Sequence, residues 1–108
     1  MSWRSGRRLP EADAEVLALV QDMTISREAF LRSLTAALDG AAYCLDGEVI
    51  RPVDAEGWRI VLAPIADLAL GALSMPRQHV EIYFAGYSGE QKERFLQRFE
   101  LAFRRAGG

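Results

Sequence analysis

The segment HVEIYFAGYSGEQKERFLQRFELAFRRA (79–106) carries the clearest structural signal in this chain. Polar and apolar residues alternate over 79–85, which is the pattern of a strand with one buried face. Glycines flank a turn at 86–89, and apolar residues then recur at helical spacing: Phe95, Leu96, Phe99, Ala102, Phe103 and Ala106. Because the repeat changes from two residues to 3.6 within a few positions, the segment predicts a strand followed by an amphipathic helix packed on a sheet.

Three upstream segments show strand or turn signals. The dipeptide Asp-Gly at 46–47 separates two short runs, 42–45 and 48–53, and predicts a β-hairpin. Alternating apolar residues predict a strand over 58–63. Residues 64–76 are ambiguous, because the proline at their start and several alanines favour a short helix or turn, whereas the spacing of the leucines also fits a short strand.

The N-terminal third has helical spacing. Pro10 begins a first predicted helix that ends near 22–24, and Ser26 is the predicted N-cap of a second helix that stops at Asp39-Gly40. The predicted order is therefore α-α-β-β-β-x-β-α. We expect an α+β fold in which two N-terminal helices and one C-terminal amphipathic helix pack on a small antiparallel sheet of three to four strands.

The length and charge of the chain limit the number of domains and the kinds of partner that we expect. At 108 residues with a net charge of −2, the chain has the size of one globular domain. Residues 1–8 hold three arginines and no acid, which predicts a disordered basic tail before a single α+β domain over 9–108. A net acidic chain argues against nucleic acid as the partner. No apolar run reaches the roughly 20 residues of a membrane helix, and Cys44 is the only cysteine, so we expect no membrane partner and a cytoplasmic location.

The sequence offers few groups for catalysis. The run GYSGE (86–90) lacks the glycine that a hydrolase nucleophile elbow needs two residues after its serine, and Ser88 with Gln91 instead predicts a helix capping box. His79 is the only histidine, and one histidine with one neighbouring carboxylate is too few for a metal site. An extended strand places His79 roughly 30 Å from Ser88, which argues against a serine–histidine pair. The sequence therefore argues against an enzyme and predicts no metal and no cofactor.

Four residues are predicted to form a binding face. His79, Glu81 and Tyr83 alternate on the polar face of their strand, and Arg59 takes the equivalent place on the 58–63 strand. If the two strands are neighbours, Arg59 and Glu81 form an ion pair across them. Such a face binds a small polar ligand or a partner, whereas the plain alternative is an ordinary solvated sheet surface.

Two functions fit this arrangement. A small sheet covered by helices on one side leaves its other face and its edges available. Aromatic residues suited to interfaces are present at four positions: Tyr43, Trp58, Tyr83 and Tyr87. We therefore expect a protein–protein interaction or assembly module that acts as a homodimer, because a two-fold contact is self-complementary. The alternative is a small-ligand-binding domain whose pocket lies between sheet and helices, with Arg59, His79 and Tyr83 near its mouth.

Overall fold

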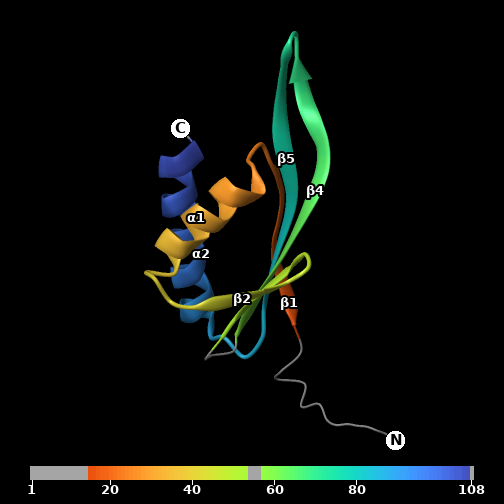
Figure 1. Cartoon of the computed structure of the whole chain (residues 1–108). Coiled ribbons are helices and arrows are strands. Elements are labelled where there is room, and N and C mark those ends of the chain that lie inside the picture. The colour runs from red at the N-terminus through yellow and green to blue at the C-terminus, as the bar shows by residue number, and fades with distance from the viewer. Residues whose placement is uncertain (1–14, 54–56, 108) are drawn as a thin grey trace, which may run out of the picture.

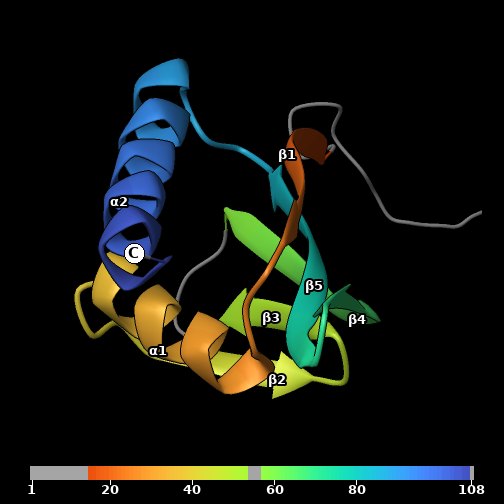
Figure 2. The same ribbon diagram turned by 90° about the horizontal axis from the view of Figure 1, so that it is seen from above.

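The computed structural model describes residues 15–53 and 57–107. Its five strands form one antiparallel sheet in the order β1-β5-β4-β3-β2, and both helices lie on the same face of that sheet (Figure 2). The elements follow along the chain as β1 (Val16–Met23), α1 (Arg27–Ala37), β2 (Tyr43–Asp46), β3 (Val49–Pro52), β4 (Trp58–Leu70), β5 (Leu73–Phe84) and α2 (Gly89–Gly107). The α+β class and the C-terminal helix are confirmed, whereas the predicted three to four strands and two N-terminal helices are wrong. The predicted basic tail, residues 1–8, lies outside the described residues.

The predicted first helix is wrong because Val16–Met23 forms the edge strand β1. This strand pairs with β5, and its register shifts between Leu17 and Leu19 at a β-bulge. The bulge inserts one residue into the alternation, so Val16, Leu19 and Met23 all pair opposite helix-facing residues of β5. The helix prediction rests on the helical spacing of Val16, Leu17, Val20 and Met23, but in the structure this segment is a strand that pairs with β5 and exposes the first three of these side chains.

Residues 64–76 form the end of β4, a tight turn and the start of β5, so the preferred prediction of a short helix or turn is wrong. Gly71 has a φ of 60° and occupies the first position of the two-residue turn, where a left-handed conformation favours glycine. Pro64 is tolerated because β3 pairs with β4 only at earlier positions, so the missing N–H costs no ladder hydrogen bond on that side. The β4–β5 hairpin consequently projects beyond the helices (Figure 1).

Local signals near turns and caps are confirmed. The Asp-Gly dipeptide at 46–47 does connect the paired strands β2 and β3. The Ala29 N–H donates to Ser26 Oγ at 3.1 Å, so Ser26 caps α1. At the start of α2 the Ser88 N–H donates to Gln91 Oε1 at 2.8 Å and the Gln91 N–H donates to Ser88 Oγ at 3.1 Å, which is a reciprocal capping box.

The hydrophobic core lies between the inner face of the sheet and the two helices. Its buried side chains come from α1, β3, β4, β5 and α2: Phe30, Leu34, Ile50, Trp58, Ile60, Leu62, Val80, Ile82, Phe84, Phe99 and Phe103. The Phe99 and Phe103 rings stack with centroids 4.2 Å apart, and the Phe30 ring lies 4.8 Å from that of Phe103. Because these rings join α1 to α2, the helical layer is fixed over one face, and the opposite face, here called the outer face, carries the polar side chains.

Candidate functional site

The outer face carries a connected group of polar side chains at the junction of β1, β5 and β4. We call it the outer-face network; it consists of Glu15, Asp22, Arg59, His79, Glu81 and Tyr83. The register explains the grouping, since β5 lies between β1 and β4 and pairs Asp22 with His79 on one side and Arg59 with Tyr83 on the other. Alternation along each strand turns these side chains away from the buried ones.

Arg59 is held on two sides. Its Nε and one terminal nitrogen donate to the two carboxylate oxygens of Glu15 at 2.7 and 2.8 Å, which is the bidentate geometry of a strong charge-assisted pair. Its guanidinium carbon also lies 4.2 Å from the centre of the Tyr83 ring. The hydrogen bonds from Arg59 lower the pKa of Glu15, and the charge of Arg51 adds to this effect. Arg59 therefore contacts a carboxylate through its N–H groups and an aromatic ring through its guanidinium face.

His79 is clamped between two carboxylates. Its Nδ1 lies 2.7 Å from Asp22 Oδ1 and its Nε2 lies 2.9 Å from Glu81 Oε2. A neutral imidazole carries a single N–H, so only the doubly protonated ring donates to both partners. Hydrogen bonds to Glu81 first and Asp22 next raise the pKa of His79 above its ordinary value of 6.5. The geometry thus indicates an imidazolium that ties the edge strand β1 to β5.

The Tyr83 hydroxyl completes the network. It donates to Glu81 Oε1 at 2.6 Å, while the other oxygen of that carboxylate faces His79. The bond from Tyr83, followed by that from His79, lowers the pKa of Glu81, and the same carboxylate raises the pKa of Tyr83. Both oxygens of Glu81 are occupied, so this carboxylate holds its neighbours in place and is a poor candidate for a proton acceptor.

The four predicted residues do lie together, although not with the predicted partners. Arg59 lies opposite Tyr83 and pairs with Glu15, so the expected direct ion pair with Glu81 is absent from the described contacts. All four lie on the outer face, away from the helices, so they cannot surround a pocket between sheet and helices. Sequence reasoning missed Glu15 and its neighbours on β1 because that segment was assigned to a helix.

The aromatic residues expected to supply an interface are mostly used inside the protein. Trp58 is buried in the core, and the Tyr87 ring stacks on Phe84. The Tyr43 hydroxyl donates to the Leu31 carbonyl at 3.4 Å. Of these four side chains, only Tyr83 belongs to the outer face, so the four do not form a shared aromatic surface.

A cavity of about 340 Å³ opens beside Arg59 on the outer face. Glu15, Arg51, Arg59 and Tyr83 supply its charged and polar lining. Among the described lining residues, two arginines and one carboxylate carry charge, and the guanidinium groups are suited to bind an anion. Within residues 15–53 and 57–107, no group of three or more His, Cys, Asp or Glu side chains is placed to hold a metal ion.

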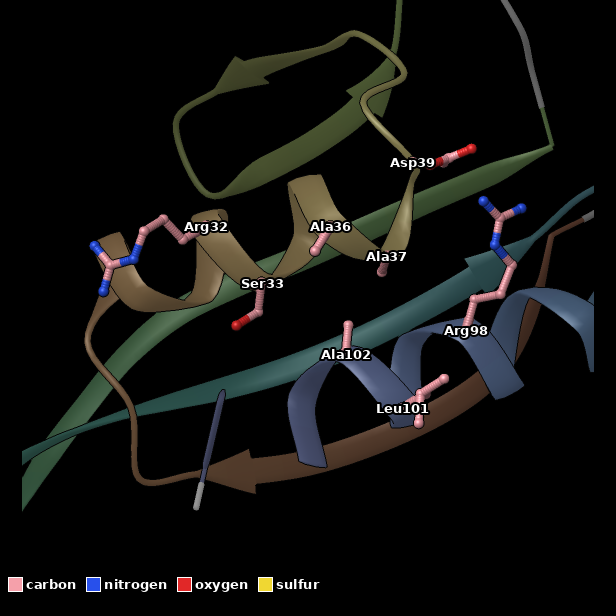
Figure 3. A pocket seen from close by; sticks show the side chains of 8 residues that line it. All are labelled: Arg32, Ser33, Ala36, Ala37, Asp39, Arg98, Leu101 and Ala102. Carbon is pink, nitrogen blue, oxygen red and sulfur yellow. The ribbon is translucent and has the colours of Figure 1, made fainter. Parts of the chain in front are cut away.

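A second groove of about 640 Å³ runs between the helices (Figure 3). Alanines form its floor, with Arg32 and Arg98 on opposite sides of the view and Asp39 near Arg98. The carboxylate and the arginines give this groove mixed charge, and the small residues let α1 and α2 approach closely. These features are those of a helix–helix contact and select no ligand.

Exposed apolar side chains gather at two other places. The edge strand β1 exposes Val16, Leu17 and Val20, and the hairpin tip exposes Leu70 and Leu73 at 52% and 65%. In the described part of the chain, no helix has the length and apolar character needed to cross a membrane. The exposed apolar side chains on β1 and at the hairpin tip are candidates for contact with protein, because clustered apolar surface often marks an interaction site.

Comparison with known proteins gives no assignment: no protein-family model and no curated protein matches this chain. The function is accordingly inferred from the geometry alone.

Proposed function

We propose that the protein is an assembly module that acts as a homodimer through the projecting β4–β5 hairpin and the sheet edge next to it. The observation that carries this proposal is the apolar hairpin itself. Pairing of β1 with β5 ends at Gln78, and β5 begins at Leu73, so the hairpin extends about 17 Å past its last neighbouring strand.

This hairpin is poorly suited to stand alone in water. Two-stranded ribbons without further packing are marginally stable, because they bury little apolar surface. Here the cross-strand pairs Leu68–Met75 and Leu70–Leu73 place several large apolar side chains on a ribbon that no other described strand covers. A contact that buries them stabilises both the ribbon and the complex.

A second copy is the partner that best fits the neighbouring surface. A cavity of about 390 Å³ lies at the root of the hairpin between β1 and α2, and apolar side chains including Leu19, Met23, Leu96 and Phe103 line it. Met23 pairs with Gln78, where the hairpin emerges, so hairpin and cavity form one continuous strip. In a two-fold dimer, the leucines at each hairpin tip lie in the other copy's cavity, and both strips are covered at once.

The two edge strands of the sheet differ in a way that favours contact of a second copy at β1. The edge strand β2 has four residues and ends in Asp46, which is a short and charged edge that discourages pairing. The opposite edge, β1, has eight residues and carries exposed valine and leucine. We place this dimer in the cytoplasm, where a single unpaired Cys44 is stable.

The proposal is tested by native mass spectrometry and light scattering over a range of concentrations. The wild-type chain is expected to be a dimer, and the double variant Leu70→Glu/Leu73→Glu should weaken the dimer about a hundredfold or more, because two buried leucines are replaced by charges. Leu45→Glu is the matched control, since Leu45 on the β2 edge is 47% exposed and lies outside the strip. It is expected to leave the dimer unchanged.

A monomer at every concentration would contradict the homodimer. A monomer that carries a defined extra mass would instead support the alternative function, a small-ligand-binding domain. Equal weakening by the hairpin variant and by Leu45→Glu would show that the added charge, and not the loss of the hairpin contact, is responsible.

A further inference from the structure

We propose that Arg51, Arg59 and Tyr83 form a carboxylate-binding site on the outer face, and that the side chain of Glu15 fills this site in the absence of a ligand. The site is independent of the proposed dimer, because it lies at the end of β5 opposite to the hairpin tip.

The guanidinium of Arg59 is positioned to bind a carboxylate. It lies on the central strand β4, its side chain is 21% exposed, and it packs over the Tyr83 ring. A guanidinium fixed by an aromatic ring presents two parallel N–H groups in one plane, which matches the two oxygens of a carboxylate. Glu15 already uses this fork in the bidentate mode that a ligand carboxylate adopts.

Arg51 supplies a second positive charge. It follows the buried Ile50 on β3 and therefore projects to the outer face, and it lines the same cavity as Arg59. No ion pair joins Arg51 to any described residue. Together with Arg59, Arg51 places two positive side chains beside the carboxylate of Glu15, and a ligand carboxylate at that position meets the same two charges.

The position of Glu15 allows its carboxylate to be displaced from Arg59 by a ligand. It lies just before the first residue of β1, and its side chain is 41% exposed. Its side-chain hydrogen bonds to the described residues are the two to Arg59. The nearby carboxylate of Glu81 is occupied by Tyr83 and His79, so it does not compete for the arginines. Removal of the Glu15 carboxylate therefore frees the fork while the surrounding network remains.

The size of the cavity indicates the ligand class. At about 340 Å³ it falls at the lower end of small-molecule sites. Apolar residues also line the cavity, namely Pro52, Val53, Trp58 and Ala85, so the ligand combines a carboxylate that faces the arginines with a short carbon chain. The site is thus assigned to a small carboxylate, with succinate as the test probe and inorganic phosphate as the comparison anion.

The experiment measures the binding of succinate to the full-length protein by isothermal titration calorimetry, and the Arg59 Nε–H signal is followed by NMR in every variant that keeps Arg59. Glu15→Gln is expected to bind succinate about fivefold more tightly than wild type, because an exposed ion pair that competes with the ligand is worth up to that factor. Glu28→Gln, on the distant helix α1, is the matched control and should behave as wild type. Adding Arg59→Lys to Glu15→Gln should abolish binding, since lysine keeps the charge and loses the fork.

Several outcomes would overturn the assignment. An Arg59 signal that moves with neither anion in Glu15→Gln means that the pair with Glu15 serves only to hold the start of β1. Tighter binding of phosphate than of succinate would replace the carboxylate by a phosphoryl ligand. Succinate binding that survives Arg59→Lys would place the anion elsewhere. Glu15→Ala provides an independent second variant and is expected to repeat the gain in affinity.

Discussion

Replacing Phe99 with alanine is expected to lower the free energy of unfolding by about 3–5 kcal/mol, whereas Arg98→Ala should change it by no more than about 0.5 kcal/mol. Phe99 is 4% exposed and stacks on Phe103 in the core. Arg98 is exposed at the rim of the groove between the helices and forms no ion pair with a described residue. Because the two positions are adjacent on one helix, their comparison isolates the effect of burial.

The expected loss for Phe99 follows from its contacts. A buried phenylalanine removes about 150–250 Å² from water, which at about 25 cal/mol per Å² corresponds to about 4–6 kcal/mol. The partly collapsed unfolded chain already buries some of this surface, and alanine favours the helix by about 0.5 kcal/mol. Loss of the stacking between Phe99 and Phe103 increases the cost of the substitution by about 0.5–1.5 kcal/mol. These contributions leave a net cost of about 3–5 kcal/mol.

Urea unfolding followed by circular dichroism measures this difference. The midpoint should fall at an unchanged slope, and the comparison should be made at several protein concentrations, because the stability of a dimer depends on concentration. A loss below about 1 kcal/mol for Phe99→Ala would refute the placement of this ring in the core. A loss of that size for Arg98→Ala would mean that the exposed side of α2 is buried in an assembly.

Three other predictions concern single residues. Because the folded-state pKa of His79 is raised, its contribution to stability is complete below pH 6.5 and is lost as pH rises through the folded-state pKa. An NMR titration of this single histidine should show the raised pKa, and Glu81→Gln should bring the pKa back toward 6.5. An unchanged pKa in that variant would contradict the hydrogen bond between His79 and Glu81. Gly57→Ala should cost more than about 2 kcal/mol in thermal unfolding, because φ is 123° and an added Cβ would overlap the Tyr87 ring, and a fully stable variant would disprove that contact. Ser88→Ala should cost about 1 kcal/mol and Ser88→Thr much less, since threonine keeps the capping oxygen; equal losses would exclude the cap.

The parts of the fold that were predicted correctly depend on neighbours in the sequence. A hairpin turn at Asp46-Gly47 and helix caps at Ser26 and Ser88 require only residues within a few positions, and each was found where expected. The strand over 79–85 was predicted because one buried face produces a regular alternation. These signals are local, and so the sequence displays them directly.

The incorrect parts depend on partners distant in the sequence. The bulge between Leu17 and Leu19 exists because β1 adapts to β5, and nothing within the segment reveals it. The strand character of 64–76 likewise follows from pairing between the two halves of one hairpin, which overrides the helix preference of its alanines. Four of the six residues in the outer-face network were predicted, whereas Glu15 was missed because it binds Arg59 from 44 positions away in the sequence.

The edge strand β1 is the element that most resists prediction, and its physical basis explains why. None of its residues is fully buried, and only Leu19 and Met23 pack against the core. Its attachment therefore depends on the backbone ladder to β5 and on ion pairs near its ends, of Glu15 with Arg59 and of Asp22 with His79 and Arg77. These ion pairs weaken as the salt concentration rises, and the pair with His79 also depends on pH. A strand held in this way shows no regular alternation of buried apolar residues, and the same weak attachment makes it the part of the sheet that salt and pH affect most directly.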